Sequence, residues 1–178
     1  MTIPSKRVLN LAGFLSCVGM MAYALYSQYQ LYLDPCPLCI LQRVAVIGMG
    51  IFFLLLAVHN PRPGWVRRIY LGLFGVSALG GIIVAGRHVW LQNLPPDKVP
   101  SCGPGLGYML DNFPLGDALK MVFTGSGECA SIDWSFLGLS MPMWVLIAIV
   151  FLVISGFWNN LKRSRPQAVA LHFGCRAS

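Results

Sequence analysis

Charged residues are scarce in this chain, and acidic residues are the scarcest of all. Only 11% of the 178 residues are charged, six of them acidic and thirteen basic, whereas 56% are hydrophobic. Soluble domains carry about 25% charged residues, so the composition argues against a soluble fold. Internal repeats and low-complexity segments are missing as well, so neither a repeat array nor a biased tract organises the chain.

What the sequence has instead is four long apolar runs, at residues 8–29, 40–58, 69–91 and 141–158. A helix needs about 20 residues, at about 1.5 Å each, to cross a bilayer. The first and last runs contain no charge, and Arg43 is the only charge in the second. The first run is longer than the apolar part of a signal peptide and lacks a small-residue cleavage site. We therefore predict a four-transmembrane-helix bundle, an all-α membrane protein with residues 1–178 as one integral membrane domain.

Small residues cluster in the third run. They are Gly72, Gly75, Ser77, Gly80, Gly81, Ala85 and Gly86. Such residues let transmembrane helices approach one another closely. We expect them to serve bundle packing rather than chemistry.

Basic and acidic residues separate onto opposite sides of this four-span arrangement. Nine of the thirteen basic residues fall on one side: Lys6, Arg7, Arg62, Arg67, Arg68, Lys162, Arg163, Arg165 and Arg176. All six acidic residues fall on the other side: Asp34, Asp97, Asp111, Asp117, Glu128 and Asp133. The positive-inside rule then places both termini in the cytoplasm. The net charge of +7 is explained by this topology and by attraction to anionic lipid rather than by nucleic-acid binding.

Two loops remain outside, a short one at residues 30–39 and a long one at residues 92–140. The long loop is rich in proline and glycine, which favours turns. Within it, "PLGDALKMVF" spaces Leu115, Leu119 and Val122 as in a short amphipathic helix. Such a helix either lies on the membrane surface or packs on the protein.

The six cysteines are sorted by this topology. Cys17 lies in the first span and Cys175 in the cytoplasmic tail. The other four face the outside, two in each loop: Cys36, Cys39, Cys102 and Cys129. An even number of cysteines on that side is expected in an oxidising compartment.

The pair in the short loop is the C-x-x-C motif "CPLC", residues 36–39. A disulfide across so short a loop constrains the unfolded chain little, so a structural brace is a poor explanation. C-x-x-C is also half of many zinc sites, and Cys102 and Cys129 could supply two further ligands. They lack the paired spacing, however, and a thiolate-rich zinc site fits poorly in an oxidising loop. We therefore favour a redox role.

A redox role also suits the position of the pair at the start of a span. Pro37 fits the first turn of a helix, so both sulfurs would lie at a helix N-terminus, where the amides and the dipole favour a thiolate. Arg43 lies four residues after Cys39, on the same face and one turn deeper. It either reaches to the membrane interface or stabilises negative charge on a thiolate or a ligand, and we favour the second role. A lipid-soluble acceptor that takes two electrons and becomes anionic, such as a quinone, would suit this site.

Two segments of the chain resemble one known family. "PCPLCILQR", residues 35–43, resembles the hallmark of the disulfide bond formation protein B family (DsbB), the quinone-linked thiol oxidases of bacterial inner membranes. "SGECASIDWSFLGLSMPMW", which leads into the last span, is similar to the second signature of that family. The resemblance runs in order from residue 8 to residue 158. It implies a protein-disulfide (thiol:quinone) oxidoreductase whose redox-active cysteines face the periplasm.

The resemblance also implies an electron route from a reduced periplasmic partner of the DsbA type to ubiquinone or menaquinone, with no metal involved. Cys102 matches the cysteine that forms a mixed disulfide with the partner. Cys129 matches the cysteine that exchanges with Cys36, and Cys39 matches the thiolate that faces the quinone.

Two further residues match the quinone end of this route. Arg43 matches the residue that supports the thiolate, and His88 matches a histidine close to the quinone site, although His88 is equally well explained as a membrane-interface residue. Cys17, Cys175 and the tail from Asn159 onward match no functional position.

Two rival classes remain open at this point. A vitamin K epoxide reductase-like enzyme also combines four cysteines with a quinone, but its C-x-x-C lies near the last span, the reverse of the order here. A non-enzymatic membrane subunit braced by disulfides is the other rival, and its disulfides would exchange less readily than catalytic ones. The resting pairing of the four cysteines stays open among three connectivities.

Overall fold

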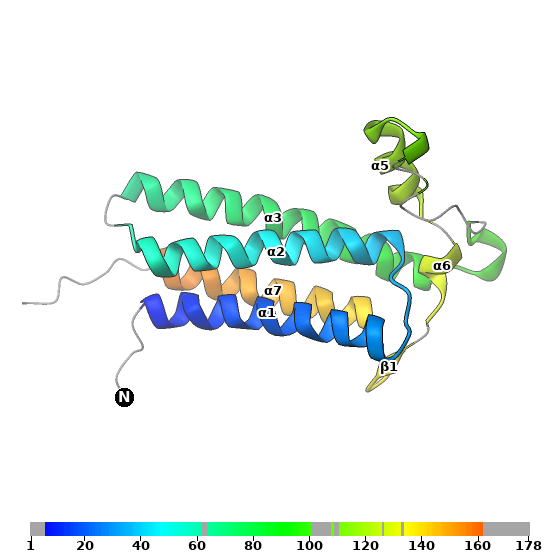
Figure 1. Cartoon of the computed structure of the whole chain (residues 1–178), viewed down its shortest axis with the longest axis horizontal. Coiled ribbons are helices and arrows are strands. Elements are labelled where there is room, and N and C mark those ends of the chain that lie inside the picture. The colour runs from blue at the N-terminus through cyan, green and yellow to red at the C-terminus, as the bar shows by residue number, and fades with distance from the viewer. Residues whose placement is uncertain are drawn as a thin grey trace, which may run out of the picture.

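Four long helices lie side by side and form a bundle (Figure 1). They are α1 (Lys6–Gln30), α2 (Pro37–His59), α3 (Gly64–Gln92) and α7 (Met141–Leu161). The structure is a computed structural model that describes residues 6–61, 64–100, 108, 111–125, 127–132 and 134–161. Each of the four helices is long and apolar enough to cross a membrane. The predicted four-transmembrane-helix bundle is confirmed.

Every helix reaches at least as far as the apolar run that predicted it. The largest extension is at the start of α3, which begins at Gly64, and the start of α2 at Pro37 and the end of α7 at Leu161 extend their runs by three residues each. A helix satisfies its own backbone hydrogen bonds inside the membrane and at its surface, so it continues through flanking polar residues. The extension of α2 matters for function, because it brings the C-x-x-C motif to the helix start.

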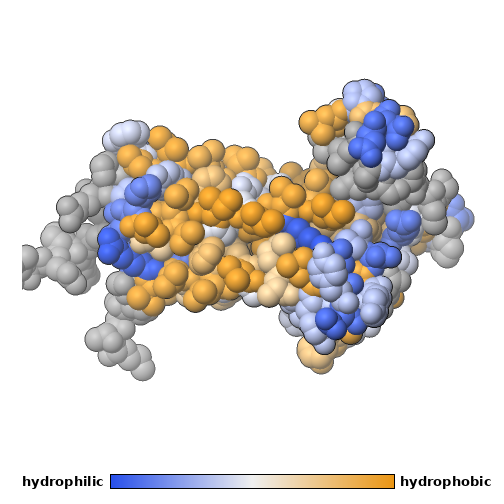
Figure 2. Space-filling view, viewed as in Figure 1, coloured by the Kyte–Doolittle hydropathy of each residue, from blue (hydrophilic) through white to orange (hydrophobic). Residues whose placement is uncertain are grey.

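The molecule has two distinct ends (Figure 1). The loop end carries the connections outside the bundle: η1 (Pro96–Lys98), α5 (Leu115–Thr124), α6 (Gly127–Ala130) and the hairpin strands β1 (Ser135–Phe136) and β2 (Leu139–Ser140). The two strands pair antiparallel, with Ser135 opposite Ser140. The start of α1 and the end of α7 lie together at the opposite end, which we call the terminal end. An apolar belt separates the polar residues of the two ends on the face shown in Figure 2.

Neighbouring helices in the chain are also neighbours in space. α1 packs on α2, α2 on α3 and α3 on α7. The interior is a cluster of Cys17, Val46, Met49, Phe53, Phe74, Ala78, Ile149 and Leu152. Of the small residues in α3, Gly81 lies tightly against Ile149 and Ala45. A Cβ atom added at Gly81 would lie 3.0 Å from Ile149 Cδ1 and 3.1 Å from Ala45 Cβ. Gly72, Gly80 and Gly86 have open space at that position, so the packing expectation is wrong for these three.

Three asparagines join α1 to α7 at the terminal end, and we call them the asparagine clasp. The amides of Asn10 and Asn160 donate to each other, Asn160 to Asn10 at 2.8 Å and Asn10 to Asn160 at 3.2 Å. Asn159 donates to Asn10 Oδ1 at 3.1 Å and to the Lys6 carbonyl at 3.2 Å. Asn10 and Asn160 are buried. These hydrogen bonds join the first helix to the last and help to close the bundle at the terminal end.

The predicted amphipathic helix is present as α5, and it is held to the end of α3. Arg87 donates from Nε and Nη2 to the carbonyls of Phe123 and Thr124, at 3.1 and 3.2 Å. These carbonyls belong to the last turn of α5, where a cation is favourable. Val122 is buried, whereas Leu115 is exposed. The helix therefore docks by its C-terminal turn on the loop end of the bundle, and contact with a membrane surface stays a prediction.

Candidate functional site

The C-x-x-C motif forms the first turn of α2. Cys36 is the N-cap residue, with extended backbone angles (φ −63°, ψ 161°), and its sulfur accepts a hydrogen bond from the Cys39 amide at 3.4 Å. Pro37 occupies the first helical position, where its missing N–H leaves no hydrogen bond unmade. Sulfur thus takes the capping place that oxygen fills in most helices. The expected location of both sulfurs at a helix N-terminus is what the structure has.

The two sulfurs of the motif are in contact. Cys36 Sγ and Cys39 Sγ are 3.2 Å apart, with Cys36 buried and Cys39 partly buried. A disulfide bond is about 2.05 Å long, so bond formation requires the sulfurs to approach by roughly 1.1 Å. Small side-chain rotations within the same turn can supply this movement. The pair is therefore arranged for reversible oxidation.

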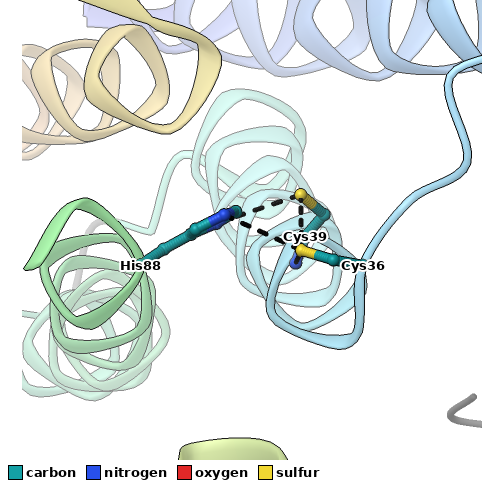
Figure 3. A group of neighbouring side chains, drawn as sticks. All are labelled: Cys36, Cys39 and His88. Atoms are coloured by element: carbon teal, nitrogen blue, oxygen red, sulfur yellow. Dashed lines mark hydrogen bonds between the residues drawn. The ribbon is translucent and has the colours of Figure 1, made fainter. Parts of the chain in front are cut away.

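His88 reaches the pair from the neighbouring helix α3 (Figure 3). Its Nε2 lies 3.8 Å from Cys36 Sγ, and its Nδ1 lies 3.9 Å from Cys39 Sγ. Only 3% of the side chain is exposed, so His88 faces the cysteines inside the bundle rather than the membrane interface. An imidazole in this position can exchange a proton with a neighbouring sulfur.

Gln42 orients His88, and sequence analysis missed it. Its side chain is buried, and its Nε2 lies 3.2 Å from His88 Nδ1. A glutamine amide can present either its nitrogen or its oxygen to Nδ1, so Gln42 can hydrogen-bond the ring in either tautomer. The available signal was its spacing, since Gln42 follows Cys39 by three residues and therefore shares its helix face.

Arg43 crosses from α2 to α1. Its Nη1 donates to Gln28 Oε1 at 2.6 Å, and its Nη2 donates to the Ala24 carbonyl at 3.2 Å. Sequence analysis did not identify these two acceptors. The side chain also lines the cavity that Cys39 lines. Arg43 thus combines a helix–helix contact with a positive charge beside the cysteine pair.

Cys129 lies on the short helix α6 at the loop end, and only 1% of it is exposed. It belongs to the same buried cluster as Cys36, together with Leu38 and Leu91. Three of the four candidate catalytic cysteines are therefore gathered at one place in the described part of the chain. Cys102, the fourth, lies outside the described residues, as does Cys175. Cys17 is buried in the interior of the bundle, away from this cluster.

A cavity of about 130 Å³ adjoins the cysteine pair. Cys36, Cys39, Arg43 and His88 line one side of it. Its apolar walls come from α1, α2 and α7 and include Met20, Met21, Val46, Met141 and Val145. The site therefore places a dithiol, an imidazole and a guanidinium beside a mainly apolar hollow within a membrane bundle.

These features define a class of protein, the membrane-embedded thiol–disulfide oxidoreductases. A protein-family model described as "Disulfide bond formation protein DsbB" matches residues 6–159. The chain belongs to this family, and it is a disulfide oxidoreductase. This result excludes a non-enzymatic subunit and the vitamin K epoxide reductase-like alternative.

Curated relatives agree with the family assignment along nearly the whole chain. The chain is 52% identical over 167 residues to disulfide bond formation protein B of Methylococcus capsulatus, covering 92% of this chain and 100% of that protein. It is 53% identical over 155 residues to the protein of the same name from Nitrosococcus oceani, covering 87% and 91%. The protein of that name from Acinetobacter baumannii is 48% identical over 162 residues, covering 91% and 94%.

Proposed function

We propose that the chain oxidises the thiols of a soluble DsbA-type partner and passes the electrons to membrane ubiquinone or menaquinone. The cavity beside Cys39 is the observation that carries the quinone part of this proposal. A protein cavity of about 150 Å³ can hold a benzene ring, and the mainly apolar cavity here is about 130 Å³. Two of its walls come from α1 and α7, whose outer faces expose large apolar side chains. A quinone ring with an apolar tail suits such a hollow in size and polarity.

In the first half of the reaction, electrons move between thiols. A partner thiolate attacks the Cys102–Cys129 disulfide at Cys102, a mixed disulfide forms, and Cys129 leaves as the thiolate. The second partner thiol then breaks the mixed disulfide, so that the partner is oxidised and the Cys102–Cys129 pair is reduced. Cys129 next attacks Cys36 of the Cys36–Cys39 disulfide and releases Cys39 as a thiolate. Cys102 then attacks Cys129 and releases Cys36, so that the Cys102–Cys129 disulfide re-forms and the Cys36–Cys39 pair holds the two electrons. The burial of Cys129 in one cluster with Cys36 supports the attack of Cys129 on Cys36.

In the second half, the Cys36–Cys39 pair returns to its disulfide, and its two electrons and two protons convert quinone to quinol. Two groups of the chain assist by their positions. His88 places Nε2 3.8 Å from Cys36 Sγ, where the imidazole can exchange a proton with a departing or attacking sulfur. Arg43 holds a positive charge on the cavity wall, which favours anionic sulfur or an anionic reduced ring. The proposal assigns no role in turnover to a metal.

The loop end is assigned to the periplasm, and both termini to the cytoplasmic side of a bacterial inner membrane. The support is the distribution of charge in the sequence. Nine basic residues lie before the first span, between the second and third, or after the fourth, and all six acidic residues lie in the other two connections. An oxidising periplasm also suits the placement of four cysteines in the two loops.

The test is a reconstituted reaction. The purified chain is supplied with quinone and a reduced DsbA-type partner, and quinone absorbance and partner thiols are followed together. We expect one quinone to be consumed for each partner disulfide formed, and we expect Cys39→Ser to stop quinone consumption. Quinone reduction that proceeds without loss of partner thiols, or that survives in Cys39→Ser, would contradict the proposal.

A further inference from the structure

Three groups that bind soft metal ions converge at the loop end of the bundle (Figure 3). They are the sulfurs of Cys36 and Cys39 and the ring of His88, and one ligand atom from each lies within 4.8 Å of the others. Two thiolates and one imidazole are a ligand set that zinc accepts, with the fourth position left to water or substrate. From the sequence, Cys102 and Cys129 were the candidates for the further ligands of a zinc site. In the structure, His88 lies beside the cysteine pair instead.

The spacing of these atoms is close to that of a tetrahedral site. With zinc–sulfur bonds of about 2.3 Å and zinc–nitrogen bonds of about 2.0–2.1 Å, tetrahedral angles place two sulfurs about 3.8 Å apart and a sulfur and a nitrogen about 3.6 Å apart. The two sulfurs here are 3.2 Å apart, and Cys36 Sγ is 3.8 Å from His88 Nε2. These two pairs therefore need adjustments of about 0.6 Å or less, and all three ligand atoms already lie within 4.8 Å of one another.

His88 is also held as a metal-binding histidine requires. Such a residue usually has its second ring nitrogen hydrogen-bonded to a polar partner, which orients the ring. The Gln42 side chain lies against Nδ1 at 3.2 Å, which leaves Nε2, 3.8 Å from Cys36 Sγ, as the nitrogen available to a metal. The two ends of an amide can exchange places by rotation, so Gln42 can accept the Nδ1 proton when Nε2 binds a metal. The same contact therefore serves both the metal-free and the metal-bound ring.

We propose that the reduced form of this site binds a thiophilic divalent cation, with Zn²⁺ as the type, through Cys36 Sγ, Cys39 Sγ and His88 Nε2. Two S–H bonds are lost, two metal–sulfur bonds form, and two protons leave to solvent, with no change in oxidation state. The disulfide form has no thiolate to offer and does not bind the ion. Water in the adjoining cavity of about 130 Å³ completes the coordination.

Charge balance favours the complex despite a nearby cation. Two thiolates neutralise the divalent ion, and a neutral complex is less costly to bury than a charged one. Arg43 lines the same cavity, and so do Asp34 and Glu128, two acidic residues that offset its charge. The bound ion holds both thiolates that must re-form the disulfide, so it traps the enzyme in its reduced form. This inhibitory effect rests on the proposed function, whereas the binding itself does not.

The binding test uses Co²⁺ as the probe, because thiolate ligation gives cobalt a charge-transfer absorption. The full-length chain carries Cys102→Ser and Cys129→Ser, is reduced with a phosphine and is titrated without oxygen. We expect one Co²⁺ per chain, displaced by Zn²⁺, and no charge-transfer band after oxidation of the remaining pair. A reduced chain that binds no Co²⁺, or a band that persists in Cys36→Ser, would overturn the site.

Two histidine variants separate this site from binding by a dithiol alone. His88→Ala removes a ligand, and Gln42→Leu removes its orienting partner, which in metal sites lowers affinity by about 10–100-fold. We expect Gln42→Leu to weaken Co²⁺ binding within that range and His88→Ala to weaken it at least as much. His59→Ala is the matched control, since His59 is exposed at the terminal end of α2. The affinity of this variant for Co²⁺ should equal that of the parent chain. Equal affinity in His88→Ala and the parent would refute the three-ligand site.

Turnover with quinone and the partner is measured separately in the unmodified chain. We expect Zn²⁺ to stop it and a chelator to restore it. If Co²⁺ binds as described but Zn²⁺ leaves turnover intact, the metal site stands, and the role of Cys36 and Cys39 in turnover is wrong. If turnover proceeds as proposed but the reduced chain binds no Co²⁺, the proposed function stands, and the metal site is wrong.

Discussion

Replacing Arg43 by methionine should slow the reaction with quinone while thiol exchange with the partner continues. The guanidinium lines the cavity beside Cys39, so the replacement removes a positive charge from the place where negative charge develops. A hydrogen bond to a charged group contributes about 1.5–3 kcal/mol, and each 1.36 kcal/mol changes a rate by about tenfold. We therefore expect kcat to fall, or KM for quinone to rise, by roughly ten- to a hundredfold.

The structure adds a second role for Arg43 that must be separated from the first. Nη1 donates to Gln28 Oε1 at 2.6 Å and Nη2 to the Ala24 carbonyl at 3.2 Å, so the residue also ties α2 to α1. Gln28→Leu removes one of these acceptors and keeps the charge, which makes it the matched control. If the charge matters, Gln28→Leu should have nearly normal quinone kinetics. The rate of quinone turnover in Arg43→Lys should lie between the rates of Gln28→Leu and Arg43→Met, because lysine keeps the charge but lacks the planar guanidinium.

The assay measures kcat and KM for quinone in all three variants, normalised to folded protein from a thermal melt. Exchange at Cys102 is measured with the soluble partner alone. Normal quinone kinetics in Arg43→Met would refute the electrostatic role. A loss in Gln28→Leu equal to that in Arg43→Met would assign the effect to the contact between α1 and α2 instead.

Three further predictions concern topology, the order of electron transfer and the histidine. An impermeant thiol reagent applied to intact, reduced cells should label Cys102 and leave Cys175 untouched, and labelling of Cys175 from outside would reverse the assigned orientation. Cys102→Ser should abolish the mixed disulfide with the partner but leave the C-x-x-C pair oxidisable by quinone. Cys39→Ser should keep thiol exchange with the partner but stop electrons from reaching quinone. Full turnover in either variant would contradict the relay. Gln42→Leu should slow turnover by roughly two- to tenfold, the range for a neutral hydrogen bond of about 0.5–1.5 kcal/mol, and nitrogen NMR of His88 should then show a mixture of ring tautomers. A single unchanged tautomer in that variant would mean that Gln42 does not orient the ring.

The spans were predictable because their signal is local. Length and lack of charge are properties of one segment at a time, and four such segments suffice to define a bundle. The start of α2 was predictable for the same reason, since Pro37 specifies a first turn and places both sulfurs there. The rotation of each helix was harder to predict, because the runs are apolar all round. Gly81 and Gly72 look alike in sequence, yet only Gly81 lies against another helix.

The contacts around the cysteines could not be read from the chain, because they join residues far apart in sequence. His88 is separated from Cys36 by 52 positions and from Gln42 by 46, and the convergence depends on how α2 and α3 are turned toward each other. Arg43 illustrates the same limit. Its place below Cys39 follows from helical spacing, but its acceptors on α1 depend on tertiary packing.

The asparagine clasp ties the first helix, α1, to the last, α7, and this has a consequence for synthesis in the membrane. Asn10 enters the bilayer with the first helix, but its partner Asn160 lies 150 positions later. At about 5–20 residues per second, the ribosome needs roughly 8–30 s to supply that partner. During this interval the first helix carries an amide that its final partner does not yet satisfy, which is unfavourable in hydrocarbon. The bundle can close at this seam only when the last helix has been inserted, so a chain that stops before α7 leaves Asn10 without these hydrogen bonds.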